Sequence, residues 1–174
     1  MFAFYLIVLR LVHVISSVCW AGGAFVNYLF IEPTAKSMAP MGMRFVQYMV
    51  TKRRFNIFMV VNSTLCVLSG ALLLWNDASG QFTAWVQTGP GLGFLLGSVV
   101  GVAVYFVGMF GIGPRAGKLG TLGQQIEAAG GTPTPAQLAE MQKLDKEMST
   151  LSMVDFWLVA LSLALMATAR YWMF

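Results

Sequence analysis

The residues with the clearest chemical potential lie inside apolar stretches of the chain. His13 is the only histidine among 174 residues, and a neutral imidazole is the commonest metal ligand in proteins. We therefore consider His13 as a ligand for haem iron or copper. The alternative is structural, in which the ring donates a hydrogen bond to a neighbouring helix. One histidine does not complete a metal site by itself, so both interpretations stay open.

Sulfur ligands are also present. Cys19 and Cys66 both lie within apolar stretches, and the chain has 12 methionines. Thiolate and thioether sulfur favour Cu(I), so the two cysteines and a methionine could form a copper site. The alternative is that both thiols are small buried side chains, as free cysteines usually are.

The histidine shares one face of its predicted helix with other polar residues. At spacings of three and four, this interior stripe consists of Arg10, His13, Ser17, Trp20, Ala24 and Asn27. A second stripe is apolar and consists of Val8, Leu11, Ile15, Val18 and Phe25. Polar groups within a membrane span usually face the bundle interior, so we expect the first stripe to face protein and the second to face lipid.

The composition excludes a water-soluble globule. Hydrophobic residues make up 57% of the chain and charged residues 10%, whereas soluble domains carry roughly 25% charged residues. Four apolar stretches, at about residues 4–30, 55–75, 91–112 and 153–172, are near or above the roughly 20 residues that span a bilayer. Backbone polar groups in lipid must be satisfied within each span. The sequence predicts an all-α transmembrane four-helix bundle in a single membrane domain.

The basic residues predict the topology. Of the 11 Lys and Arg residues, five lie in connection 31–54 and four in connection 113–152, while the connection between the second and third spans has none. Cytoplasmic loops are enriched in Lys and Arg. We therefore expect both basic connections to be cytoplasmic and both termini to be non-cytoplasmic, in an integral protein of a bacterial inner membrane.

Both basic connections contain helical patterns. Residues 39–54 mix apolar and basic side chains at helical spacing, which suits either a helix lying beside anionic headgroups or an ordinary juxtamembrane loop. In the other connection, Gly130 and Gly131 predict a break. Thr134 and Gln137 resemble a capping box, so we expect a helix to begin at Pro135 and to lead into the fourth span.

Depth in the membrane relates His13 to three other residues. Counting about 1.5 Å per residue along each span places His13 level with Gly70, Gly97 and Met166. The glycines would leave room for a flat macrocycle, and Met166 offers a sulfur axial ligand. Glycines of the third span also predict close helix packing, within the chain or with another subunit, at Gly93, Gly97, Gly101 and Gly108.

Several of these residues belong to a longer pattern. Its parts are Leu11-Val12-His13, Trp20-Ala21-Gly22-Gly23-Ala24-Phe25, Glu32-Pro33, Arg53-Arg54-Phe55 and Ser69-Gly70. The pattern covers about the first 75 residues and resembles that of copper-resistance D-like (CopD-like) integral membrane proteins. The resemblance implies that His13 corresponds to the first-helix histidine, a suggested metal ligand. A similar opening occurs in a haem-binding membrane oxidase of protoporphyrinogen.

Other function classes lack support in the sequence. Motifs for ATP hydrolysis, zinc proteolysis, dithiol redox chemistry and serine hydrolysis are absent. The basic residues flank membrane spans, so nucleic-acid binding is not indicated. We expect a non-enzymatic membrane protein with haem b, copper or no cofactor. The alternatives are an accessory subunit of a larger respiratory or photosynthetic electron-transfer complex and a haem-linked oxidoreductase.

Overall fold

The computed structural model describes residues 2–39 and 41–174, and every regular element in this part of the chain is helical. The main helices are α1 (Phe2–Val26), α4 (Phe55–Ala78), α6 (Gly89–Phe106) and α8 (Pro135–Thr168). The shorter ones are α2 (Glu32–Ser37), α3 (Met41–Thr51), α5 (Phe82–Val86) and α7 (Gly113–Ala128). Two π-helical turns, η1 (Asn27–Ile31) and η2 (Val107–Ile112), join α1 to α2 and α6 to α7, and the 3₁₀ turn η3 (Ala169–Tyr171) follows α8.

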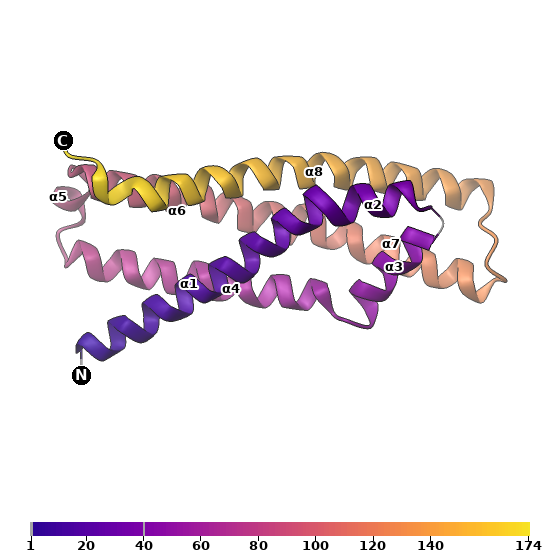
Figure 1. The fold of residues 1–174 in the computed structure, drawn as a ribbon, viewed down its shortest axis with the longest axis horizontal. Helices are drawn as coiled ribbons and strands as arrows, with labels where there is room; N and C mark the ends of the chain where they lie inside the picture. Colours follow the sequence, from indigo (N-terminus) through magenta and orange to yellow (C-terminus); the bar gives the residue numbers. More distant parts are fainter. Residues whose placement is uncertain (1, 40) are drawn as a thin grey trace.

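Four helices of this structure are long and apolar enough to cross a membrane, which confirms the predicted all-α fold with four candidate spans. Both termini lie at one end of the bundle, and the two basic connections lie at the other end, which we call the loop end (Figure 1). The arrangement agrees with four antiparallel crossings. The side of the membrane that each end faces stays a prediction.

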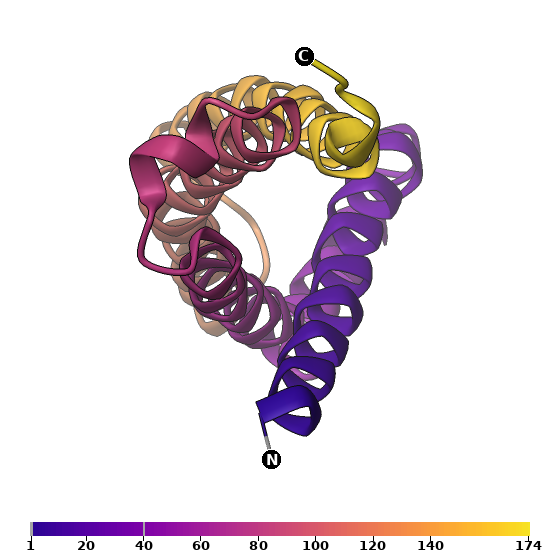
Figure 2. The ribbon, with the colours of Figure 1, turned by 90° about the vertical axis from the view of Figure 1, so that its left-hand side faces the viewer.

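The helices form two pairs, α1 with α4 and α6 with α8 (Figure 2). Helix α1 runs obliquely: it crosses α4, and its continuation approaches α8 (Figure 1). There the ring of Phe156 lies 5.1 Å from that of Phe25 and 4.8 Å from that of Tyr28. The buried core joins the pairs through small side chains, Ala21, Ala24, Val104 and Val159.

Two proline residues explain why the spanning helices change pitch without ending. Pro33 and Pro114 each stand at the beginning of the helix that follows a π-helical turn. Proline cannot donate a backbone hydrogen bond, and single-turn π-bulges absorb such a shift in bonding register. The sequence analysis ended the first and third spans near these positions. The helices instead continue to Ser37 and Ala128, so α7 is an element that the sequence analysis did not predict.

The predicted start of α8 is confirmed. Gly130 and Gly131 both have positive φ, at 100° and 82°. The backbone N–H of Gln137 donates to Oγ1 of Thr134, and the N–H of Thr134 donates to Oε1 of Gln137, which completes the capping box. The same helix continues without a break into the fourth span.

Candidate functional site

His13 lies in the interface between α1 and α4 and is held there by two oxygen atoms. Its Nδ1 is 2.9 Å from the carbonyl oxygen of Cys66 and 3.3 Å from Oγ of Ser69. A carbonyl oxygen only accepts hydrogen bonds, so Nδ1 carries the proton. The Ser69 hydroxyl donates to the carbonyl of Leu65, which leaves its oxygen able to accept from the ring. In the neutral imidazole the lone pair is therefore on Nε2.

Gly70 provides the space in which the ring lies. A β-carbon at this position would be 2.8 Å from Cε1 of His13, which is too close for any real contact. Only glycine lets the imidazole rest against the backbone of α4. The sequence analysis placed His13 and Gly70 at one depth, and the structure brings them into contact. The space beside Gly70 is filled by the imidazole itself.

The second ring nitrogen of His13 has no hydrogen-bond partner among the described residues. All buried side-chain nitrogen and oxygen atoms in that part of the chain have partners, and His13 is only partly buried. Nε2 therefore remains accessible from outside the chain. Histidines that ligate metals almost always donate their other ring N–H to a carbonyl, a carboxylate or water. His13 has this orientation and this tautomer.

Cys66 belongs to the same cluster. The hydroxyl of Ser17 donates to the carbonyl of His13 at 2.6 Å, and its oxygen lies 3.0 Å from Sγ of Cys66. Because the hydroxyl proton is used in the first bond, the thiol donates in the second. Sγ is also 3.9 Å from Nδ1 of His13. His13 and Cys66 were predicted to belong to separate candidate sites, whereas they lie side by side.

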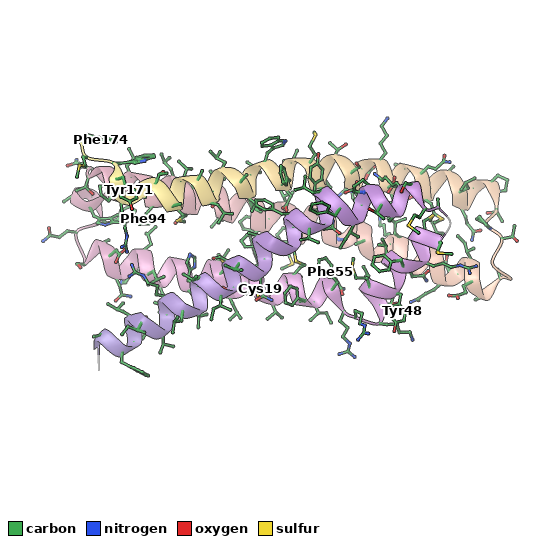
Figure 3. The ribbon with its side chains drawn as sticks, in the orientation of Figure 1. Cys19, Tyr48, Phe55, Phe94, Tyr171 and Phe174 are labelled. Carbon is green, nitrogen blue, oxygen red and sulfur yellow. The ribbon has the colours of Figure 1, made fainter. Side chains whose placement is uncertain are left out.

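The described contacts of the other proposed sulfur ligands do not include His13. Cys19 is a free, half-buried thiol (Figure 3), and the described partners of Cys66 are Ser17 and His13. Met166 packs against Gly97 in the α6–α8 pair, where a β-carbon on the glycine would be 3.0 Å from its Cγ. No group of three or more His, Cys, Asp or Glu residues in the described part of the chain could hold a metal ion. A metal bound at His13 must therefore receive its other ligands from outside this set.

The glycines of α6 face α8 of the same chain. β-Carbons at Gly93, Gly97 and Gly101 would lie 2.8 Å from Ala169, 3.0 Å from Met166 and 3.2 Å from Ser162. Oγ of Ser162 donates to the carbonyl of Gly97 at 2.9 Å. Gly108, which lies in η2, has no neighbour within 4 Å of its β-carbon position. Three of the four glycines thus serve packing within the chain, which the sequence left open.

The interior stripe of α1 follows the oblique course of the helix. Ser17 contacts α4, Trp20 packs against the core, and Asn27 is half-buried at the start of η1. Arg10 is exposed, so this end of the stripe does not face the bundle interior. On the apolar stripe, Val8, Leu11, Ile15 and Val18 are exposed, whereas Phe25 packs against Phe156.

Outside the histidine cluster, the structure places charged side chains at two further points, an ion pair and a buried carboxyl group. Nε of Arg115 donates to Oε2 of Glu147 at 2.7 Å, and its Nη1 donates to the carbonyl of Gly111 at 2.9 Å, which joins α7 to α8. Asp155 is only 7% exposed. The three ion pairs between described residues do not include it.

His13 and its α4 neighbours form one cluster of polar contacts between two candidate spans. The arrangement can offer one oriented imidazole nitrogen to an external ligand. Its remaining donors and acceptors bond to one another across the α1–α4 interface. Comparison of the chain with protein-family models, curated proteins and solved structures gives no match.

Proposed function

We propose that this chain is a non-enzymatic integral membrane protein that binds a metal centre, haem iron or copper, through Nε2 of His13. The observation that carries the proposal is the 2.9 Å contact between Nδ1 of His13 and the carbonyl of Cys66. It fixes the tautomer in which Nε2 keeps its lone pair, and the described hydrogen bonds of the ring all involve Nδ1. The resemblance of the first 75 residues or so to copper-resistance D-like proteins supports copper as one of the two centres.

The proposal is tested on protein purified in mild detergent from the membranes in which it is expressed. A Soret absorption band would identify haem, and metal analysis would identify copper. His13→Ala should remove whichever centre is present while the helical circular dichroism spectrum is retained. A wild-type protein that carries neither centre, and takes up neither when they are supplied, would refute the proposal.

We also propose the orientation that the basic residues favour, with the loop end in the cytoplasm of a bacterial cell. Nine of the 11 Lys and Arg residues lie in the two connections at that end. The site of His13 would then lie in the half of the bilayer nearer the termini. Labelling of single introduced cysteines in intact cells tests this orientation: a cysteine at Ser79 should react with an impermeant reagent and one at Thr132 should not.

A further inference from the structure

The outward face of α3 is apolar. Met41, Phe45 and Tyr48 follow one another at spacings of four and three residues and are 67%, 55% and 54% exposed. Tyr48 lies on the outer surface of the helix near its end (Figure 3). The outward face of a surface helix in water is normally polar. This apolar row therefore indicates a surface that contacts an environment or a partner other than water.

The other face of α3 is already packed against its own chain. Gly42 is buried and lies against the backbone of Ala35 in α2. The side chain of Gln47 lies against Gly123 of α7, where a β-carbon would be 3.3 Å from its Nε2. These contacts fix which face of the helix is turned outward. The apolar row is thus exposed because the opposite face of α3 packs against α2 and α7.

Basic residues accompany the apolar row. Arg44 lies on the same side of α3, and the helix is followed by three exposed cations, Lys52, Arg53 and Arg54, which we call the basic turn. None of these four residues takes part in the three ion pairs between described residues. Residues 38–54 contain no Asp or Glu. These cations therefore lack acidic partners in their own segment.

The positive charge of the loop end is concentrated at this place. Connection 113–152 contains four basic and four acidic residues, so its formal charges cancel. Connection 31–54 contains five basic residues and one acidic residue. An anionic partner is therefore favoured beside α3 and the basic turn, and not beside α7 or the beginning of α8.

The position of the basic turn next to the start of α4 favours a lipid phosphate as the anion. The basic turn directly precedes Phe55, where the membrane-spanning helix α4 begins. Arg54 has φ 54° in the left-handed region, and the chain turns there so that α3 lies at an angle to α4 (Figure 1). In a bilayer that α4 spans from Phe55 onward, these cations would lie at the edge of the hydrocarbon, beside the lipid phosphate groups. The apolar row extends from the same edge.

We propose that the outward face of α3 and the basic turn form a binding site for an acidic phospholipid. The apolar row enters the boundary between headgroups and acyl chains, as in helices that lie in a membrane interface. The basic turn contacts the lipid phosphate through charge-assisted hydrogen bonds. A zwitterionic lipid lacks the net negative charge that this arrangement selects.

The test counts lipids that remain on the full-length protein. Wild-type protein in mild non-ionic detergent is equilibrated with equal amounts of phosphatidylglycerol and phosphatidylcholine, and bound lipid is measured by native mass spectrometry. We expect phosphatidylglycerol to be retained preferentially. The triple variant Lys52→Gln/Arg53→Gln/Arg54→Gln should reduce that preference by up to about a hundredfold, since each of the three cations contributes a factor of about five near an anionic surface.

The matched control removes the same number of charges from the same end of the bundle. Lys118→Gln/Lys143→Gln/Lys146→Gln should leave the preference unchanged. Equal retention of both lipids by the wild type, or an equal loss in the control variant, would overturn the proposal. Displacement of the lipid by millimolar inorganic phosphate would show a site for free anions and would also overturn it.

A measurement on the wild type alone tests the proposal even if the triple variant does not fold. Retention of phosphatidylglycerol should fall as NaCl is raised from 0.05 to about 0.5 M, because the Debye length shortens and exposed cations are screened. Retention that is independent of salt would contradict a site built on the basic turn. Capture of an acidic protein without any lipid preference would assign the surface to a protein partner and overturn the proposal.

Discussion

Nδ1 of His13 lies 2.9 Å from the carbonyl oxygen of Cys66, and this contact joins the first two membrane-spanning helices at the only histidine of the chain. The contact orients the ring, fixes its tautomer and leaves Nε2 available. A structural histidine needs only the first of these properties. The described hydrogen bonds of the ring all involve Nδ1, and this is what links the packing of α1 against α4 to the proposed binding of a metal centre.

Gly70→Ala should disturb the site although His13 itself is not substituted. The new β-carbon would be 2.8 Å from Cε1 of His13, so the ring or the α1–α4 distance must shift, at a cost of about 1–3 kcal/mol. We expect a lower melting temperature and weaker metal binding. Gly22→Ala is the control, because no atom lies within 4 Å of its β-carbon position. Equal thermal stability of the two variants would contradict the described packing.

The glycines of α6 should differ in sensitivity. A β-carbon at Gly93 would meet the backbone Cα of Ala169 at 2.9 Å, whereas one at Gly97 would meet the flexible side chain of Met166 at 3.0 Å. Gly93→Ala should therefore destabilise the bundle by about 1–3 kcal/mol, and Gly97→Ala by less. Thermal unfolding in detergent measures the order. Gly108→Ala should be close to neutral, and a larger loss there than at Gly93 would show that α6 has another partner.

Asp155→Asn should not lower the stability of the bundle. The carboxyl group is 7% exposed and takes part in none of the ion pairs between described residues. A buried charge without a partner is costly, and asparagine keeps the shape without the charge. We expect an unchanged or higher melting temperature. A fall of several degrees would indicate that a cation near the loop end, such as Arg53 or Arg54, pairs with this carboxylate.

Cys66→Ser should separate the two ways in which copper could bind. If the ligand is Nε2 of His13, the variant keeps the main-chain carbonyl that orients the ring, and copper or haem binding is retained. If the ligand is a thiolate, binding is lost. The stoichiometry of Cu(I) after dialysis checks this outcome, and Cys19→Ser provides a control in which one thiol is removed outside the histidine cluster.

The fold was largely predictable because the number and length of the apolar stretches determine how many helices can span a membrane. Four apolar stretches give four spans, and the capping box at Thr134 places the start of α8. Helix α7 was missed because its glycines and polar residues give little helical signal. Contacts with other helices stabilise it, namely the ion pair of Arg115 with Glu147 of α8 and the contact of Gly123 with Gln47 of α3.

The candidate site was predictable only in part. Counting residues gives depth in the membrane, and depth correctly paired His13 with Gly70. It does not give the rotation of a helix about its axis. For that reason Cys66 was grouped with Cys19, although it faces Ser17 and His13. Likewise Met166 was grouped with His13, although it packs against Gly97 in the other helix pair.

The most direct test of the central proposal compares the wild type with His13→Asn. The asparagine amide can still donate to the carbonyl of Cys66, but it cannot replace Nε2 as a ligand. Both proteins are titrated in detergent with haem and, separately, with Cu(I), and their helical content is recorded. The account predicts that the wild type binds one of the two in stoichiometric amount and that His13→Asn stays folded without binding it. Equal binding by both proteins, or binding of neither centre by the wild type, would contradict it.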